Sequence, residues 1–381
     1  MPQPEPALRA PDLPLQIPSL DGMRAVSIML VLFAHAASTR GFPEFFDRES
    51  FTSLGNVGVR FFFVISGFLI TTLLLRDLDR HGHVRLPLFY KRRALRILPA
   101  ALAYIGVIWA AYMAGLIDLR YQHLSDTQAT SAVPGLLHAL SFTYNYKLDY
   151  NWYFNHLWSL SVEEQFYLLW PFTLAWLGLA RGARVALAAL LVVPFIRLGM
   201  HLSGEWPELA LSRNFQAVCD SIATGCLGAI FFNAMSTRRA FAWLTGWPAI
   251  PIAGACIAIG YGSALFSRPI AYVAGQSLAN LGILLLLLHV ITRPRDLAGR
   301  ILNTGPMVAI GVLSYSLYLW QEPFLYFRGT GWATAFPQNI VLTFIAAYAC
   351  HRLVEKPFLA IKQRLGTKPV APATPDPATP A

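Results

Sequence analysis

Long apolar blocks, separated by polar or proline- and glycine-rich breaks, are the feature that most restricts what this chain can fold into. Because a helix needs roughly 20 apolar residues to cross the hydrocarbon core of a bilayer, such blocks predict membrane-spanning helices. The composition agrees, since 55% of the residues are hydrophobic and only 13% are charged, too few to cover a soluble globule. Blocks such as 185–193 and 282–288 also lack the alternation of a transmembrane barrel strand.

We therefore predict an all-α fold, a polytopic membrane bundle of about ten transmembrane helices. The predicted spans are 22–39, 55–75, 96–116, 157–179, 185–202, 213–234, 241–262, 271–291, 304–327 and 337–354. They form one transmembrane domain over 20–358, and the polar ends 1–19 and 359–381 are predicted to be disordered.

Lysine and arginine are distributed unevenly over the segments between these spans. When alternate segments are assigned to opposite sides, 21 basic residues fall on one side and 7 on the other. Cytoplasmic segments carry the excess of basic residues, so both termini are predicted to be cytoplasmic. The net charge of +10 is spread over these segments, which argues against a nucleic-acid-binding domain.

The four cysteines all fall inside predicted spans. Cys219, Cys226, Cys256 and Cys350 are therefore predicted to be small packing residues rather than a disulfide framework or metal ligands. No metal site is expected.

The first predicted span contains two ionisable residues, Arg24 and His35. On a straight helix they are about three turns, or roughly 16 Å, apart and share one face at different depths. Asp21 is placed to cap Arg24. Charged groups within a membrane usually line a cavity, form pairs or carry function. The alternative is that Arg24 extends to the interface while His35 makes an interhelical hydrogen bond.

Arg93 and Arg96, in the most polar segment, stand three residues apart on one helical face. Two guanidinium groups so placed suit the recognition of phosphate groups. The alternative is an ordinary basic cytoplasmic segment with no ligand.

Ser159, Glu163 and Tyr167 recur every four residues at the start of the fourth span and form one stripe, with Glu164 on a neighbouring face. A buried carboxylate there is suited to acid or base chemistry, or to orienting His35. The alternative is a solvated, inert position at the outer interface.

Asp220 and the pair Gln321–Glu322 complete the polar groups within spans, and each of these could simply line a helix junction. Arg197 and His289 are assigned to packing or interface roles.

Six stretches, in this order along the chain, resemble the membrane acyltransferase-3 family. They are LDGMRAVSIMLVLFAH, GVRFFFVISGF, FYKRRALRILP, WSLSVEEQFYLLWP, GVLSYSLYLWQEPF and RLVEKPF. The resemblance extends from about Leu20 to Phe358. It implies a bacterial inner-membrane protein that transfers an acyl group, usually acetyl, from cytoplasmic acyl-CoA to a hydroxyl of a lipopolysaccharide, an exopolysaccharide or another glycan. Many family members have a histidine near Gln321 and Glu322, so no catalytic role is assigned to this pair.

These residues lead to a hypothesis for the mechanism. His35 is the general base, or a transient acyl carrier, and Glu163 orients it or relays its proton. The phosphate and pantetheine ends of the donor are bound by Arg24, Arg93 and Arg96, with the thioester threaded along the first span. Support or substrate binding is assigned to Ser159, Glu164, Tyr167 and Asp220. The partners expected are acyl-CoA, a carbohydrate acceptor and the bilayer, without nucleic acid, and the oligomeric state stays open. The chief alternative is a proton-coupled transporter or flippase.

Overall fold

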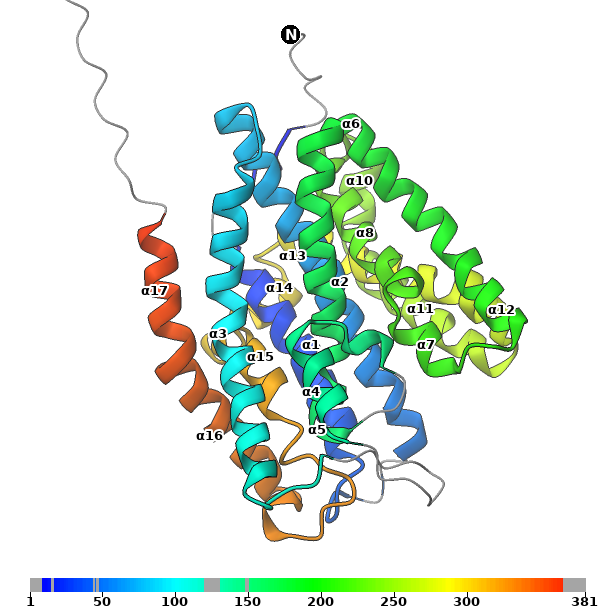
Figure 1. Cartoon of the computed structure of the whole chain (residues 1–381). Coiled ribbons are helices and arrows are strands. Elements are labelled where there is room, and N and C mark those ends of the chain that lie inside the picture. The colour runs from blue at the N-terminus through cyan, green and yellow to red at the C-terminus, as the bar shows by residue number, and fades with distance from the viewer. Residues whose placement is uncertain are drawn as a thin grey trace, which may run out of the picture.

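The computed structural model describes residues 9–14, 17–43, 45, 48–119, 131–147 and 151–365. Within these residues every regular element is a helix and no strand occurs, which confirms the predicted all-helical class. Most of the N-terminal segment and the tail from 366 lie outside the described residues. Residues 359–364, expected in the disordered tail, instead belong to α17 (Lys356–Arg364), which lies at the left edge of the bundle and packs against α3 (Figure 1).

The longer helices follow the predicted spans in order. They are α1 (Pro18–Ala36), α2 (Arg48–His81), α3 (Leu86–Met113), α6 (Leu157–Ser203), α8 (Phe215–Ile230), α11 (Ala249–Gly262), α13 (Gln276–Thr292), α15 (Gly305–Trp320) and α16 (Gln338–Cys350). Short helices connect them: α4 (Val133–Leu140), α5 (Trp152–Asn155), α7 (Glu208–Arg213), α9 (Phe232–Ser236), α10 (Arg239–Leu244), α12 (Arg268–Ile270) and α14 (Leu297–Leu302). Five further short turns are η1 (Tyr144–Tyr146), η2 (Ser263–Leu265), η3 (Ala271–Gly275), η4 (Trp332–Thr334) and η5 (His351–Glu355).

Five of the described helical stretches are long and apolar enough to cross a membrane. They are Ser19–Ala36, Ser53–His81, Leu86–Met113, Trp152–Ser203 and Arg268–Thr292. Two shorter apolar stretches are Ala249–Leu265 and Gly305–Trp320. A polytopic helical membrane protein is therefore supported. The finer prediction of ten spans stays a prediction, because the other described helices are shorter than a membrane span.

The sequence predicted two spans, 157–179 and 185–202, where α6 runs through 47 residues. Gly178 breaks this helix with φ 74° and ψ 171°, a conformation that a residue with a side chain rarely adopts. Figure 1 shows α6 turning sharply at the top of the molecule and descending at a different angle. The two predicted spans are thus the two arms of a helix bent at one glycine.

Helix α1 packs against α2 and α15 through positions without side chains. A Cβ at Gly58 would collide with the Ser27 carbonyl oxygen, and one at Gly311 would collide with that of Asp21. Glycine at such contacts lets two helices approach closely. This packing holds α1, and with it Arg24 and His35, in the interior of the bundle.

A buried ion pair joins α6 to α8 in the other half of the bundle. Arg197 Nη1 donates to Asp220 Oδ2 at 2.8 Å, and both side chains are 0% exposed. Arg197 also donates to the carbonyl groups of Tyr272 and Ala217. The packing role predicted for Arg197 agrees with this arrangement. Asp220 is thus a structural partner of Arg197, and its role in substrate binding or support of the site stays a prediction.

Candidate active site

Arg24 and His35 lie on one continuous helix, α1, as the sequence predicts. Arg24 Nη1 donates to Asp21 Oδ1 at 2.9 Å, so the expected cap is confirmed. His35 occupies the last turn of α1, with 30% of its side chain exposed. The two ionisable groups therefore lie towards opposite ends of one helix.

A cavity of about 620 Å³, here called the arginine cavity, lies where α1, α3 and α17 meet the end of α2. Six basic side chains line it: Arg24, Arg85, Arg92, Arg93, Arg96 and Lys362. Among its three acidic residues, Asp21 pairs with Arg24 and Asp77 with Arg85. In the described part of the chain, no carboxylate pairs with Arg93 or Arg96. The cavity therefore carries an excess of positive charge suited to a polyanionic ligand.

The pKa of Lys362 is affected by this excess of positive charge. Its burial, together with the charges of Arg96, Arg93, Arg92 and Arg24, lowers its pKa to about 8. Lys362 belongs to α17 and was not identified from the sequence, because it lies in the tail expected to be disordered. A bound anion would raise this pKa and keep Lys362 charged to higher pH.

A smaller cavity of about 90 Å³, the inner cavity, adjoins the arginine cavity. Arg24, Arg93 and Arg96 line both cavities. The predicted stripe is brought to the same place, because Ser159, Glu163 and Tyr167 all line the inner cavity. One ligand could therefore reach from the three guanidinium groups to the stripe.

Two contacts fix the polar groups of the inner cavity. Glu163 Oε1 accepts a hydrogen bond from Ser66 Oγ at 2.8 Å. The Arg93 guanidinium lies 4.8 Å from the centroid of the Tyr167 ring, within cation–π range. Glu164 lines neither the arginine cavity nor the inner cavity, and its Oε1 is buried without a hydrogen-bond partner among the described residues.

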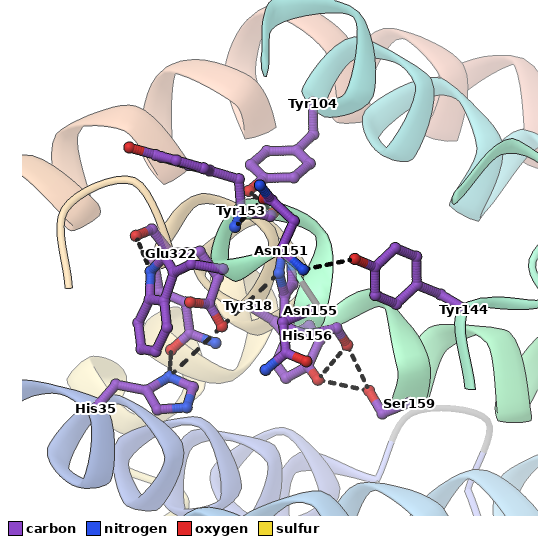
Figure 2. Close-up of polar contacts among 12 residues, drawn as sticks. His35, Tyr104, Tyr144, Asn151, Tyr153, Asn155, His156, Ser159, Tyr318 and Glu322 are labelled. Carbon is purple, nitrogen blue, oxygen red and sulfur yellow. Dashed lines mark hydrogen bonds and ion pairs between the residues drawn. The ribbon is translucent and has the colours of Figure 1, made fainter. Parts of the chain in front are cut away.

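His35 is oriented by Gln321 and Glu322, to which the sequence analysis assigned no catalytic role. Its Nδ1 lies 3.1 Å from Gln321 Oε1 and 3.9 Å from Glu322 Oε1 (Figure 2). Its ring packs edge-on against Trp152, whose indole N–H donates to the Glu322 carbonyl at 2.7 Å. Glu163 was predicted to orient His35, but it is bonded to Ser66 instead. The sequence feature that points to these partners of His35 is the polar pair Gln321–Glu322 at the end of an apolar helix.

The Gln321 contact selects the tautomer of His35. A carboxamide oxygen can only accept, so the hydrogen bond requires the proton on Nδ1, and Nε2 then carries the free lone pair. That form of imidazole can accept a proton from a hydroxyl group.

Two aromatic side chains separate the inner cavity from His35. The Tyr318 hydroxyl bonds Ser159 Oγ at 2.6 Å and donates to the His156 carbonyl at 2.9 Å. The His156 ring lies 5.5 Å from the Tyr318 ring, and its Nδ1 is 3.8 Å from Glu322 Oε1. Figure 2 shows these contacts, which run from Ser159 through Tyr318 and His156 to Glu322. Tyr318 and His156 therefore lie between the inner cavity and the residues that contact His35, beside the first span along which we predict the thioester to be threaded.

Comparison with known proteins decides the family. The acyltransferase-domain family matches residues 17–350, most of the chain. The chain belongs to this acyltransferase family. The resemblance stated from the six sequence stretches is thus confirmed. The matched residues end before α17, so the family match does not include Lys362.

Two relatives of this acyltransferase are named as O-acetyltransferases. The chain is 28% identical over 372 residues to the O-acetyltransferase OatA of Staphylococcus aureus (strain NCTC 8325 / PS 47), covering 90% of this chain and 57% of that protein. It is 28% identical over 367 residues to the peptidoglycan O-acetyltransferase OatA of Listeria monocytogenes, covering 90% of this chain and 55% of that protein. The chain thus spans little more than half the length of these relatives. No solved structure matches the chain.

Proposed function

We propose that this chain is an integral membrane O-acetyltransferase that moves the acetyl group of acetyl-CoA to a hydroxyl of a cell-envelope glycan. The observation that carries the proposal is the position of Arg24, Arg93 and Arg96, which line both the arginine cavity and the inner cavity. Peptidoglycan is the first acceptor to examine, because one relative is named for it. Lipopolysaccharide and exopolysaccharide are the other candidates.

The donor would bind with its nucleotide in the arginine cavity. A cavity volume of about 620 Å³ lies within the range of small-molecule binding sites. The phosphate groups of CoA can accept paired hydrogen bonds from the arginine guanidinium groups. Acyl-CoA is a cytoplasmic metabolite, so this cavity would face the cytoplasm, as would both termini. The basic excess in the segments around the cavity supports that orientation.

The pantetheine arm would extend from the three arginines into the inner cavity and then towards His35. At about 90 Å³ the inner cavity is too small for the whole arm, and Tyr318 closes its far end. The proposal therefore requires the Tyr318 side chain to move when the donor binds. Its hydroxyl is held by two hydrogen bonds, to Ser159 and to the His156 carbonyl, which such a movement would break.

In the transfer step, His35 Nε2 takes the proton of the acceptor hydroxyl while the hydroxyl oxygen bonds to the thioester carbonyl carbon. The tetrahedral intermediate then collapses, the carbon–sulfur bond breaks, and the departing thiolate takes the proton from His35. Gln321 would hold the imidazole in the required tautomer, and the Glu322 carboxyl group would stabilise the imidazolium. In the alternative mechanism the His35 imidazole itself carries the acetyl group transiently. Ping-pong kinetics would reveal that mechanism.

The test uses the full chain in lipid nanodiscs with radiolabelled acetyl-CoA and, separately, peptidoglycan, lipopolysaccharide and exopolysaccharide. We expect label in one glycan product, and its loss in the His35→Ala variant. Substituting Arg93→Gln should raise KM for acetyl-CoA and leave KM for the acceptor unchanged.

A transporter or flippase would give a different result. In sealed vesicles, movement of the glycan across the membrane without transfer of label would contradict the proposed enzyme and support the carrier. Full transfer by His35→Ala would remove His35 from the mechanism while leaving the activity itself intact.

A further inference from the structure

Two more cavities continue from the inner cavity through the other half of the bundle. A cavity of about 50 Å³, the Arg60 cavity, shares Val59 and Phe63 with the inner cavity. A cavity of about 300 Å³, the rim cavity, shares Tyr261 and Gln276 with the Arg60 cavity. These shared residues make one row of cavities that begins at the arginine cavity.

The rim cavity opens far from the arginine cavity. Its lining includes Glu208 of α7 and Arg268 of α12, and these two side chains form an ion pair. In Figure 1, α7 and α12 lie at the lower right, away from the turn between α2 and α3 at the upper left. A second ligand could therefore approach Val59 and Phe63 from the side opposite the donor.

Arg60 is a buried cation with no counter-ion among the residues that the structure describes. It is 6% exposed, and its guanidinium donates to the neutral groups of Ser221, Asn280 and Gln276. In the described part of the chain it forms no ion pair with a carboxylate, since Asp220 is paired with Arg197. A buried charge is costly unless it is paired. Arg60 therefore offers a strong site for an anion that enters the cavity.

Tyr261 supplies a second polar group at the same place. Its buried hydroxyl lies beside Arg60 and has no hydrogen-bond partner among the described residues. Tyr261 and Gln276 stand at the junction of the Arg60 cavity and the rim cavity. A guanidinium, a carboxamide and a phenol hydroxyl thus converge on one small space.

We propose that Arg60, Gln276 and Tyr261 bind an acidic group of the acceptor, a carboxylate or a phosphate, on the side of Val59 and Phe63 opposite the inner cavity. This inference rests on the proposed function, because it identifies where that acceptor binds and which class it belongs to. The acidic group belongs either to a sugar of the glycan or to the phosphate of a lipid carrier, and the two sources are separable by experiment.

The first measurement is direct binding to the full chain in nanodiscs, without acetyl-CoA. The probes are a tetrasaccharide of alternating N-acetylglucosamine and N-acetylmuramic acid, the neutral tetrasaccharide of N-acetylglucosamine, and undecaprenyl phosphate. We expect one acidic probe to bind about tenfold or more tightly than the neutral one, as for a lost charge-assisted hydrogen bond. The acidic probe that binds identifies the source as sugar carboxylate or carrier phosphate. Equal binding of all three, or no binding of any, would overturn the inference.

Variants then tie binding to these residues. Arg60→Gln should abolish the preference for the acidic probe. Tyr261→Phe should weaken its binding severalfold at unchanged thermal stability, because the lost hydroxyl has no hydrogen-bond partner in the described part of the chain. Should Arg60→Gln fold poorly, Tyr261→Phe alone decides the question. Arg181→Gln, at an exposed arginine outside these cavities, is the matched control.

Activity separates this inference from the proposed function. Acidic-probe binding that depends on Arg60, combined with no acetyl transfer to any glycan, would refute the enzyme and retain the site. Acetyl transfer with the same acceptor KM in wild type, Arg60→Gln and Tyr261→Phe would refute the site and retain the enzyme.

Discussion

The carboxamide oxygen of Gln321 lies 3.1 Å from Nδ1 of His35, and this contact joins the end of α15 to the end of α1. It replaces the Glu163 contact that the sequence suggested. Because the oxygen accepts the Nδ1 proton, the basic nitrogen of His35 is the one that faces away from Gln321.

Removing this contact should slow the chemical step. We expect Gln321→Leu to lower kcat about fivefold, the worth of one neutral hydrogen bond, with KM for acetyl-CoA unchanged. His35→Ala should lower kcat by about 10² to 10⁴. Steady-state kinetics with purified protein checks both. Gln321→Glu, which keeps an acceptor oxygen, is the control, and a Gln321→Leu variant with wild-type kcat would show that the contact does not matter.

Lys362 should make donor binding depend on pH. Its pKa is lowered to about 8 by burial and neighbouring arginines, and a bound polyanion favours the charged form. Above pH 8 the free protein loses this charge, so KM for acetyl-CoA should rise roughly threefold to tenfold between pH 8 and pH 10.

Two substitutions at Lys362 separate this effect from other titrations. Lys362→Arg keeps its charge throughout, so its KM should stay low and flat over this interval. Lys362→Met should give a high KM at pH 7 already. The same pH profile in all three proteins would contradict a role for Lys362.

Loosening Tyr318 should expose the thioester to water. Tyr318→Phe removes the hydrogen bonds to Ser159 and to the His156 carbonyl while keeping the ring. We expect faster hydrolysis of acetyl-CoA in the absence of acceptor, measured as thiol release. Tyr104→Phe is the matched control, because its buried hydroxyl also donates to a backbone carbonyl, that of Tyr153. Equal hydrolysis in the two variants would mean that Tyr318 does not close the path.

The Arg197–Asp220 pair should govern stability rather than catalysis. Asp220→Asn leaves a buried guanidinium without its counter-charge, and we expect a loss of about 3–5 kcal/mol in the free energy of unfolding. The double variant Arg197→Met with Asp220→Leu should recover much of that loss. Thermal unfolding in detergent measures both. If Asp220→Asn instead raised KM for the acceptor at unchanged stability, the structural assignment would be wrong.

Much of the fold follows from the sequence alone. Apolar blocks of sufficient length can satisfy their backbone in a bilayer only as helices, so the all-helical class and the order of the helices were predictable. The spacing of Ser159, Glu163 and Tyr167 likewise fixes a common face, because helical periodicity is local. Arg24 and His35 on one helix are another local consequence.

Only the tertiary structure decided which of these faces meet. The contact of His35 with Gln321 joins residues 286 positions apart, and the pairing of Arg197 with Asp220 joins two different helices. No periodicity within one segment specifies such contacts, because they depend on how helices pack at positions such as Gly58 and Gly311. For the same reason the sequence offered Glu163 as the partner of His35, and the packed bundle supplied Gln321.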